Sequence, residues 1–144
     1  MNLKVISPPE EEPITLERAQ KELRTDEDIS DLIVAAREYC ESYQNKRYIT
    51  QTLELNLESF PVEREIEFRD CSPVQSVSSV KYYDADDIEY ILPNTDYIVD
   101  TNSFISRIVL RNDKSWPDII LRPVNGVVIQ FVAGYGNAAA PDQA

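Results

Sequence analysis

The spacing of apolar residues divides the chain into two parts with different periods. Up to about residue 48, apolar residues recur every three or four positions, which predicts helices; beyond it they alternate with polar residues, which predicts strands. Two helices are expected, at about 16–24 and 27–45, the first with Thr15 as its N-cap. The predicted divisions are a helical part (1–48), a β domain (49–136) and a C-terminal tail (137–144). The fold class is therefore α+β, with an N-terminal pair of helices followed by a mainly antiparallel β domain.

The second predicted helix has one apolar face and one acidic face. Its apolar residues are Ile29, Leu32, Ile33, Ala36, Tyr39, Cys40 and Tyr43. Its polar residues are Asp31, Glu38, Glu41, Ser42 and Asn45. The spacing of the first set is that of an amphipathic helix. For Cys40 we favour packing within the apolar face over the role of a reactive thiol.

The β domain begins with the clearest alternation in the chain. In TLELNLESF, Leu53, Leu55 and Leu57 are expected to point inward. Further strands are predicted in REIEF, SVSSVKYY, IEYIL, DYIVD and RIVL. GVVIQFVA is apolar on both faces, which predicts a central strand, whereas LKVI near the N-terminus is expected at a sheet edge. VNG predicts a tight hairpin, and DIILR before Pro123 an edge strand or loop.

The acidic segment YYDADDIEY, at 82–90, is a candidate calcium site. Asp84 and Asp86 match the first and third positions of a calcium loop. Ile88 then stands where a third oxygen ligand is needed, and Glu89 where the loop requires glycine. Neighbouring carboxylates in a turn also cannot face each other across a cleft, as a glycosidase requires. We therefore interpret DADD as the turn of a hairpin.

A glycine pattern near the C-terminus resembles a dinucleotide-binding motif. Gly134, Gly136 and Ala139 have the G-x-G-x-x-A spacing after a strong strand. Only five residues follow Ala139, too few for the helix and the acidic residue that such a site needs. The favoured interpretation is a strand exit at which small residues let backbones approach closely.

Composition and charge exclude several classes of function. The 144 residues fit one domain of ordinary size, and 26 acidic against 14 basic residues give a net charge of −12, which repels nucleic acid and anionic lipid. Histidine is absent, which removes Ser-His-Asp and Cys-His catalysis. Cys40 and Cys71 match no metal-ligand spacing, so free thiols are expected. We predict a soluble protein without cofactor, metal ion, membrane contact or enzymatic activity.

Aromatic residues of the β domain offer a candidate protein-binding surface. Tyr82, Tyr83, Tyr90 and Tyr97 could form an exposed strip for a partner, and cross-strand packing inside the sheet is the alternative. The single tryptophan, Trp116, is expected at a core or corner position. Neither feature indicates a reaction.

Several segments in their joint order carry a resemblance to a known family. They are ISPPEEEPITLERAQKELR, DEDISDLIVAAREYCESYQNKRYITQTLEL, SPVQSVSSVKYYDADD, DYIVD, SWP and VIQFVAGYGNAAA, spread over 6–140. In this order they resemble the head-to-tail connector (adaptor) proteins of long-tailed bacteriophages and prophages. The resemblance implies a structural protein of the virion neck, made in the cytoplasm of the host bacterium.

The family's architecture implies partners. Its members form a ring under the portal protein and pass the connection on to a stopper or tail-completion protein, while double-stranded DNA moves through without specific binding. A cyclic ring needs two complementary faces on each subunit, and about a dozen copies are expected. Members usually continue into a C-terminal helix pair, so 137–144 is either a tail or the start of a helix that this chain lacks.

The resemblance also gives the acidic helix face a candidate role. A ring lumen lined by carboxylates repels phosphates, so we place Asp31, Glu38 and Glu41 on the channel-facing side; the alternative is that they form an ordinary solvated face. Two other classes of function stay open. One is a monomeric acidic module that binds a basic protein by imitating DNA, and the other is a small enzyme that uses carboxylates alone.

Overall fold

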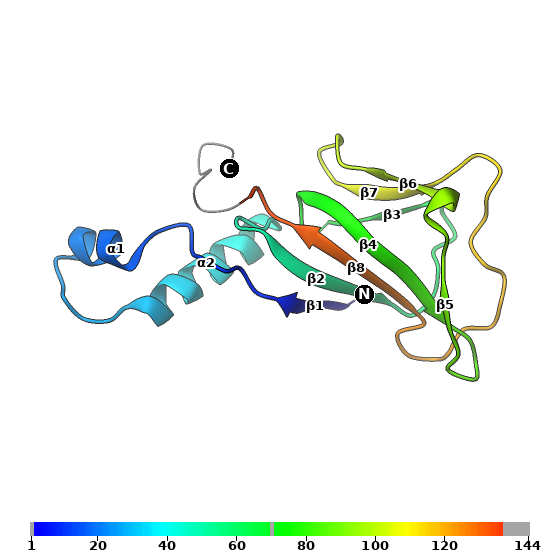
Figure 1. Cartoon of the computed structure of the whole chain (residues 1–144), viewed down its shortest axis with the longest axis horizontal. Coiled ribbons are helices and arrows are strands. Elements are labelled where there is room, and N and C mark those ends of the chain that lie inside the picture. The colour runs from blue at the N-terminus through cyan, green and yellow to red at the C-terminus, as the bar shows by residue number, and fades with distance from the viewer. Residues whose placement is uncertain (1, 70, 137–144) are drawn as a thin grey trace.

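The protein consists of a helical arm beside a β unit (Figure 1). The computed structural model describes residues 2–69 and 71–136, so the predicted tail at 137–144 lies outside the described residues. The helical arm comprises α1 (Leu16–Leu23) and α2 (Ser30–Gln44). It extends from one end of the β unit, which gives the described chain an elongated shape.

Both predicted helices are present in the arm. Thr15 caps α1 as expected, because its hydroxyl oxygen accepts a hydrogen bond from the N–H of Arg18 at 3.2 Å. The second helix begins at Ser30, three residues later than the predicted start at 27. Asp28 lies in the turn ahead of it, where its carboxylate accepts hydrogen bonds from the N–H and the hydroxyl of Ser30. Such Asx turns compete with the helical conformation, which explains the later start.

A five-stranded antiparallel sheet forms the larger layer of the β unit. Its strands are β1 (Asn2–Ser7), β2 (Gln51–Leu57), β8 (Val127–Ala133), β4 (Val74–Tyr83) and β5 (Glu89–Ile91), in that spatial order. The segment GVVIQFVA is thus central and the N-terminal strand lies at an edge, as the apolar pattern predicts. The alternation in TLELNLESF is confirmed at Leu53 and Leu55, which are buried. It ends at Asn56, which is buried although an outward position was expected, and Leu57 is half-buried against the same core.

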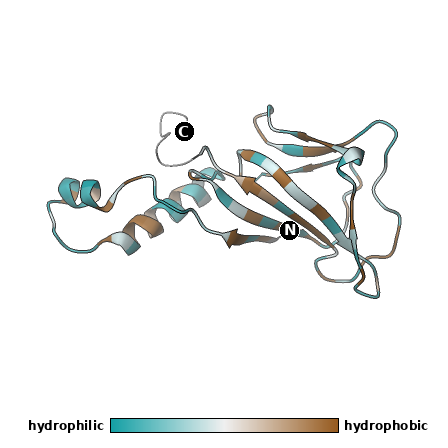
Figure 2. Cartoon of the chain, viewed as in Figure 1, coloured by the Kyte–Doolittle hydropathy of each residue, from teal (hydrophilic) through white to brown (hydrophobic). Residues whose placement is uncertain are grey.

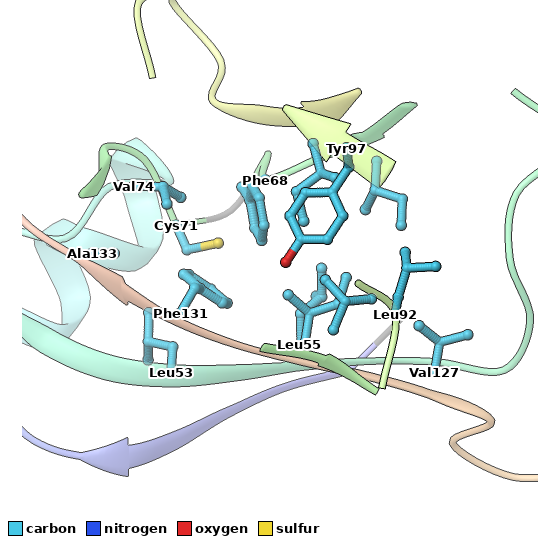
Figure 3. Close-up of a cluster of buried hydrophobic side chains, with 14 residues drawn as sticks. Leu53, Leu55, Phe68, Cys71, Val74, Leu92, Tyr97, Val127, Phe131 and Ala133 are labelled. Carbon is cyan, nitrogen blue, oxygen red and sulfur yellow. The ribbon is translucent and has the colours of Figure 1, made fainter. Parts of the chain in front are cut away.

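A three-stranded antiparallel sheet forms the second layer. Its strands are β3 (Glu65–Glu67), β7 (Arg107–Leu110) and β6 (Tyr97–Asp100), and a short 3₁₀ helix (Asn94–Asp96) precedes β6. The core lies between the two layers, with Phe68 and Tyr97 on one side and Leu55 and Phe131 on the other (Figure 3). The rings of Phe68 and Phe131 are tilted against each other, with their centroids 4.6 Å apart.

The segment VNG does not form the predicted hairpin. Leu121 on one side of it bridges to Asp84, and Val127 on the other side pairs with Tyr82. Both flanks therefore run along the same strand, β4, and the intervening residues bulge away from it. Asn125 does adopt the left-handed conformation that a tight hairpin turn requires, with φ of 51°. Its carbonyl accepts two hydrogen bonds from Arg122. The preceding segment DIILR is a loop with one bridge, as expected.

The central position of Phe131 gives a first prediction. Its side chain is fully buried at the meeting point of the two sheets, so Phe131→Ala should lower the free energy of unfolding by about 3–5 kcal/mol through lost burial and a residual cavity. Urea denaturation followed by circular dichroism measures the change. Val62→Ala is the control, because Val62 is 99% exposed and should change stability by less than about 0.5 kcal/mol. Similar losses for both variants would contradict this placement of the core.

Candidate functional site

The acidic segment DADD is a hairpin turn, as predicted. The N–H of Asp87 donates to the carbonyl of Asp84 at 3.0 Å, and β4 and β5 pair on either side. The carboxylate of Asp84 accepts hydrogen bonds from the N–H groups of Ile88 and Asp86 and from the hydroxyl of Tyr90. The bond from Ile88 is the main cause that lowers the pKa of Asp84. This carboxylate stabilises the turn, which accounts for it without a metal ion.

The glycine pattern at the end of β8 has a structural role at its first position. Gly134 has φ of 125°, and a Cβ atom there would lie 2.6 Å from the backbone of Ile49. Only glycine fits this conformation and this close approach. Ala139, the third residue of the pattern, lies outside the described residues.

The aromatic residues of the β unit pack mainly against one another. Tyr82 and Tyr90 are cross-strand partners whose rings stack with centroids 5.3 Å apart, and Phe60 contacts Tyr82 edge-on. Trp116 stacks on Phe60 and donates its indole N–H to the carbonyl of Glu63 at 2.7 Å. Tyr97 is buried in the core. Cross-strand packing accounts for Tyr82 and Tyr90, burial in the core for Tyr97, and a corner position for Trp116. The ring of Tyr83 packs against the guanidinium of Arg122, 3.8 Å from the ring centroid.

Within residues 2–69 and 71–136, no group of three or more acidic or cysteine side chains is arranged to hold a metal ion. Neither described helix is long and apolar enough to cross a membrane. The features described next are surfaces, and they lie on the helical arm and where it joins the β unit.

The buried face of α2 differs from the face that the apolar pattern predicts. The buried residues form one row at four-residue spacing: Ile29, Ile33, Arg37 and Glu41. The prediction that Glu41 faces a channel is wrong, because only 2% of its surface is exposed. The carboxylate points into the joint between the arm and the β unit, where it accepts hydrogen bonds from three donors.

Glu41 connects three segments through its two carboxylate oxygens. Oε1 accepts a hydrogen bond from Nη1 of Arg37 at 2.6 Å, and Oε2 accepts from the backbone N–H of Tyr48 at 2.8 Å and from Nε2 of Gln51 at 3.2 Å. Nε of Arg37 in turn donates to Glu12 at 2.6 Å. We call these five residues the joint network. Burial acts to lower the pKa of Arg37, but its bonds to Glu12 and Glu41 outweigh that effect and raise it.

An apolar groove runs along the helical arm. It has a volume of about 510 Å³ and is lined by Pro13, Ile14, Ala19, Glu22, Leu23, Ile29, Leu32, Ile33, Ala36, Arg37, Cys40 and Tyr48. The helix packing beneath it is thin, with Ala19, Ile29 and Ile33 as its buried apolar residues and Leu16 packed against them. In Figure 2 the hydrophobic colour of α2 is concentrated in its first half, and the half nearer the β unit is mainly hydrophilic.

Much of the predicted apolar face of α2 is exposed. Leu32 is 63% exposed, Tyr39 72% and Tyr43 80%, and Ala36 and Cys40 are exposed as well. Cys40 therefore lines an open groove and is not buried in a core. Tyr39 and Tyr43 stack on each other on the surface of the arm. An uncovered apolar area on a short arm is typical of a surface that another protein segment covers.

The other two predicted channel residues are on the surface. Asp31 and Glu38 are both exposed and are seven residues apart, so they lie two turns apart on the same side of α2. Their orientation toward a channel remains a prediction. The joint network was not predicted from the sequence, although an Arg and a Glu at i and i+4, Arg37 and Glu41, were a visible signal.

Comparison with known proteins identifies the fold. No family model and no curated protein sequence matches the chain. Solved structures do match over 97% of this chain. A chain in the neck of an empty gene transfer agent (GTA) particle, computed with C6 symmetry, has a TM-score of 0.77 and 20% identity, with 75% of that chain covered.

Two further structures agree. A chain in the neck of the native GTA particle, computed with C12 symmetry, has a TM-score of 0.73 and 19% identity, with 74% of that chain covered. A chain in the virion of the native GTA particle has a TM-score of 0.76 and 17% identity, with 75% of that chain covered. At these identities the likeness establishes a shared fold, and that fold is consistent with the connector resemblance.

The joint network gives a second prediction. Glu41→Gln keeps the shape of the side chain but removes its charge, and it places an amide N–H₂ against at least one donor among Arg37, Tyr48 N–H and Gln51. We expect a loss of about 3 kcal/mol in the free energy of unfolding, because Arg37 stays buried with one carboxylate fewer. Chemical denaturation measures it.

Glu38→Gln is the matched control on the same helix. Its carboxylate is 66% exposed and 3.9 Å from Arg37, so the change should be below about 0.5 kcal/mol. Equal stability of the two variants would show that the joint network does not hold the arm.

Proposed function

We propose that this protein is a structural component of a phage-like neck: a head-to-tail connector, or adaptor, that assembles as a ring between the portal and a stopper or tail-completion protein. The observation that carries the proposal is the likeness to chains in GTA necks, which extends over 97% of the chain. A match over nearly the whole chain includes the helical arm as well as the β unit. The residues that carry the connector resemblance in the sequence cover the same length.

Symmetry supports the ring. The neck structures that contain the similar chains were computed with C6 and C12 symmetry. A ring of about a dozen copies of this chain would use heterologous contacts, in which one face of each copy meets a different face of the next. The uncovered apolar groove of the helical arm is a candidate for one of these contacts, since exposed apolar patches of this kind mark interaction sites.

Charge supports a passage for DNA. Each copy carries a net charge of −12, so an assembled ring holds a strongly negative lumen wherever its carboxylates face inward. Such a lumen repels the phosphates of double-stranded DNA and lets the duplex pass without specific binding. Asp31 and Glu38 are the candidates on α2 for this lining. Glu41 does not contribute to it, because its carboxylate is buried. The role requires no catalytic residue, and we propose none.

The state of assembly distinguishes this function from its alternative, a monomeric acidic module that imitates DNA. We predict that the purified protein, mixed with the portal protein of the same virion, sediments as a complex of about a dozen copies and appears as a ring in electron micrographs. A DNA-imitating module would instead form a small, salt-sensitive complex with a basic protein and would leave the portal unbound. That outcome would contradict the connector function.

The lumen assignment gives a separate prediction. Rings of the double variant Asp31→Lys/Glu38→Lys should retain linear double-stranded DNA at low salt and release it as the salt concentration rises, because the lining then attracts phosphates. Wild-type rings should retain none. A filter-binding assay with labelled DNA measures retention.

Glu58→Lys/Glu63→Lys is the matched control. Both residues are exposed and lie in the segment that follows β2, so the variant has the same change in net charge at another place. Equal DNA retention by the two variants would mean that total charge decides the effect, and the assignment of Asp31 and Glu38 to the lumen would fail.

A further inference from the structure

A second pocket lies at the joint between the helical arm and the β unit. Its volume is about 580 Å³. Pro8 and Pro9 of the segment that follows β1 line it together with Asn45, just after α2, and with Arg47 and Gln51. Arg37 and Glu41 of the joint network also line it. The lining thus combines apolar side chains with two guanidinium groups and two carboxylates, in contrast to the apolar groove of the arm.

Arg47 has an unsatisfied donor in this pocket. Its Nε atom is buried and has no hydrogen-bond acceptor within the described residues. The guanidinium makes one long bond, from Nη1 to the carbonyl of Lys46 at 3.3 Å. Its backbone is held in place, because its N–H donates to the carbonyl of Ser72 at 2.8 Å. A buried cationic donor without an acceptor is unfavourable, so the side chain is poised for an external acceptor.

The carboxylates that line the pocket form no ion pair with Arg47. Both oxygens of Glu41 accept hydrogen bonds from Arg37, Tyr48 and Gln51, and Glu12 pairs with Arg37. Glu38, the remaining acid that lines the pocket, is largely exposed and approaches Arg37 at 3.9 Å. Arg37 is thus neutralised within the subunit, whereas Arg47 forms no ion pair among the described residues.

We propose that the pocket receives an aspartate or glutamate side chain from a neighbouring copy of this chain, which pairs with Arg47. The inference rests on the proposed ring. A guanidinium fork matches a carboxylate in shape and charge, and a pair shielded from solvent is stronger than one on the surface. Each copy has 26 acidic residues and a net charge of −12, so adjacent copies repel each other unless a cation lies at their contact.

Five other cations, Lys4, Arg18, Lys21, Arg24 and Arg111, form no ion pair among the described residues, but all five are exposed on the surface. The remaining cations are already engaged. Arg37, Arg69, Lys81, Arg107, Lys114 and Arg122 all form ion pairs inside the subunit. Arg64 donates to the backbone carbonyl of Arg111, and Lys46 donates to the hydroxyl of Tyr135. Arg47 combines a position on the pocket, a buried donor and the lack of an ion pair among the described residues. In a heterologous contact, Arg47 would lie on one face of each copy, and the carboxylate that pairs with it would lie on the opposite face of the adjacent copy.

Substitution of Arg47 tests the inference. For Arg47→Gln we expect a monomer with wild-type circular dichroism and melting temperature, and an association constant for ring formation on the portal that is lower by at least about tenfold. Arg111→Gln is the matched control, because Arg111 is exposed and forms no ion pair among the described residues; it should assemble as the wild type does. Arg47→Lys keeps the charge but not the forked shape of the guanidinium. Its association constant should lie between those of Arg47→Gln and the wild type.

A reconstruction of the wild-type ring tests the same point without a variant. We expect a carboxylate of the adjacent copy at about 3 Å from the guanidinium group of Arg47. Full assembly of Arg47→Gln, or a ring whose pocket contains only solvent or a DNA phosphate, would overturn the inference and leave the connector function intact. If the wild-type protein forms no ring with the portal, the proposed function fails and the inference fails with it.

Discussion

The buried carboxylate of Glu41 is the constraint on which the shape of this protein depends. It lies near the end of α2 and binds Arg37, the backbone of Tyr48 and the side chain of Gln51 at once. Arg37 extends the connection to Glu12, ahead of α1. The network therefore joins the segment before the arm, the arm itself and the first residue of β2. Removing one member leaves buried polar groups without partners, so the network holds as a unit.

The two parts of the molecule differ in how completely they bury their apolar surface. The β unit encloses a core between two sheets, with residues such as Phe131 and Ile108 fully buried. The helical arm buries little more than Ala19, Ile29 and Ile33 and leaves Leu32, Tyr39 and Tyr43 exposed. The β unit carries an arm whose apolar surface is incompletely covered. Such an arm is suited to assembly, because neighbouring subunits can cover that surface. Under the proposed function, shape, apolar surface and negative charge are the properties that act, and the polar joint fixes where the arm points.

The sequence predicts the β unit better than the arm, for physical reasons. Alternating apolar and polar residues and turn residues indicate strands in the sequence. The central place of Val127–Ala133 and the turn at Asp84 therefore follow from the sequence pattern. The split into two sheets depends on contacts between residues far apart in the chain, such as Phe68 and Phe131, which no local pattern contains. On α2, the rule that charged residues face solvent assigned Glu41 to the surface. The rule failed because Arg37 and Glu41 neutralise each other, which allows both to be buried.

A reconstruction, made without imposed symmetry, of the phage-like neck in which we propose that this protein assembles tests the central claim most directly. The account predicts a closed ring of copies of this fold next to the portal, with an acidic surface of the arm toward the DNA. A neck that lacks this fold, or that holds it as a single copy bound to a basic protein, would contradict the account.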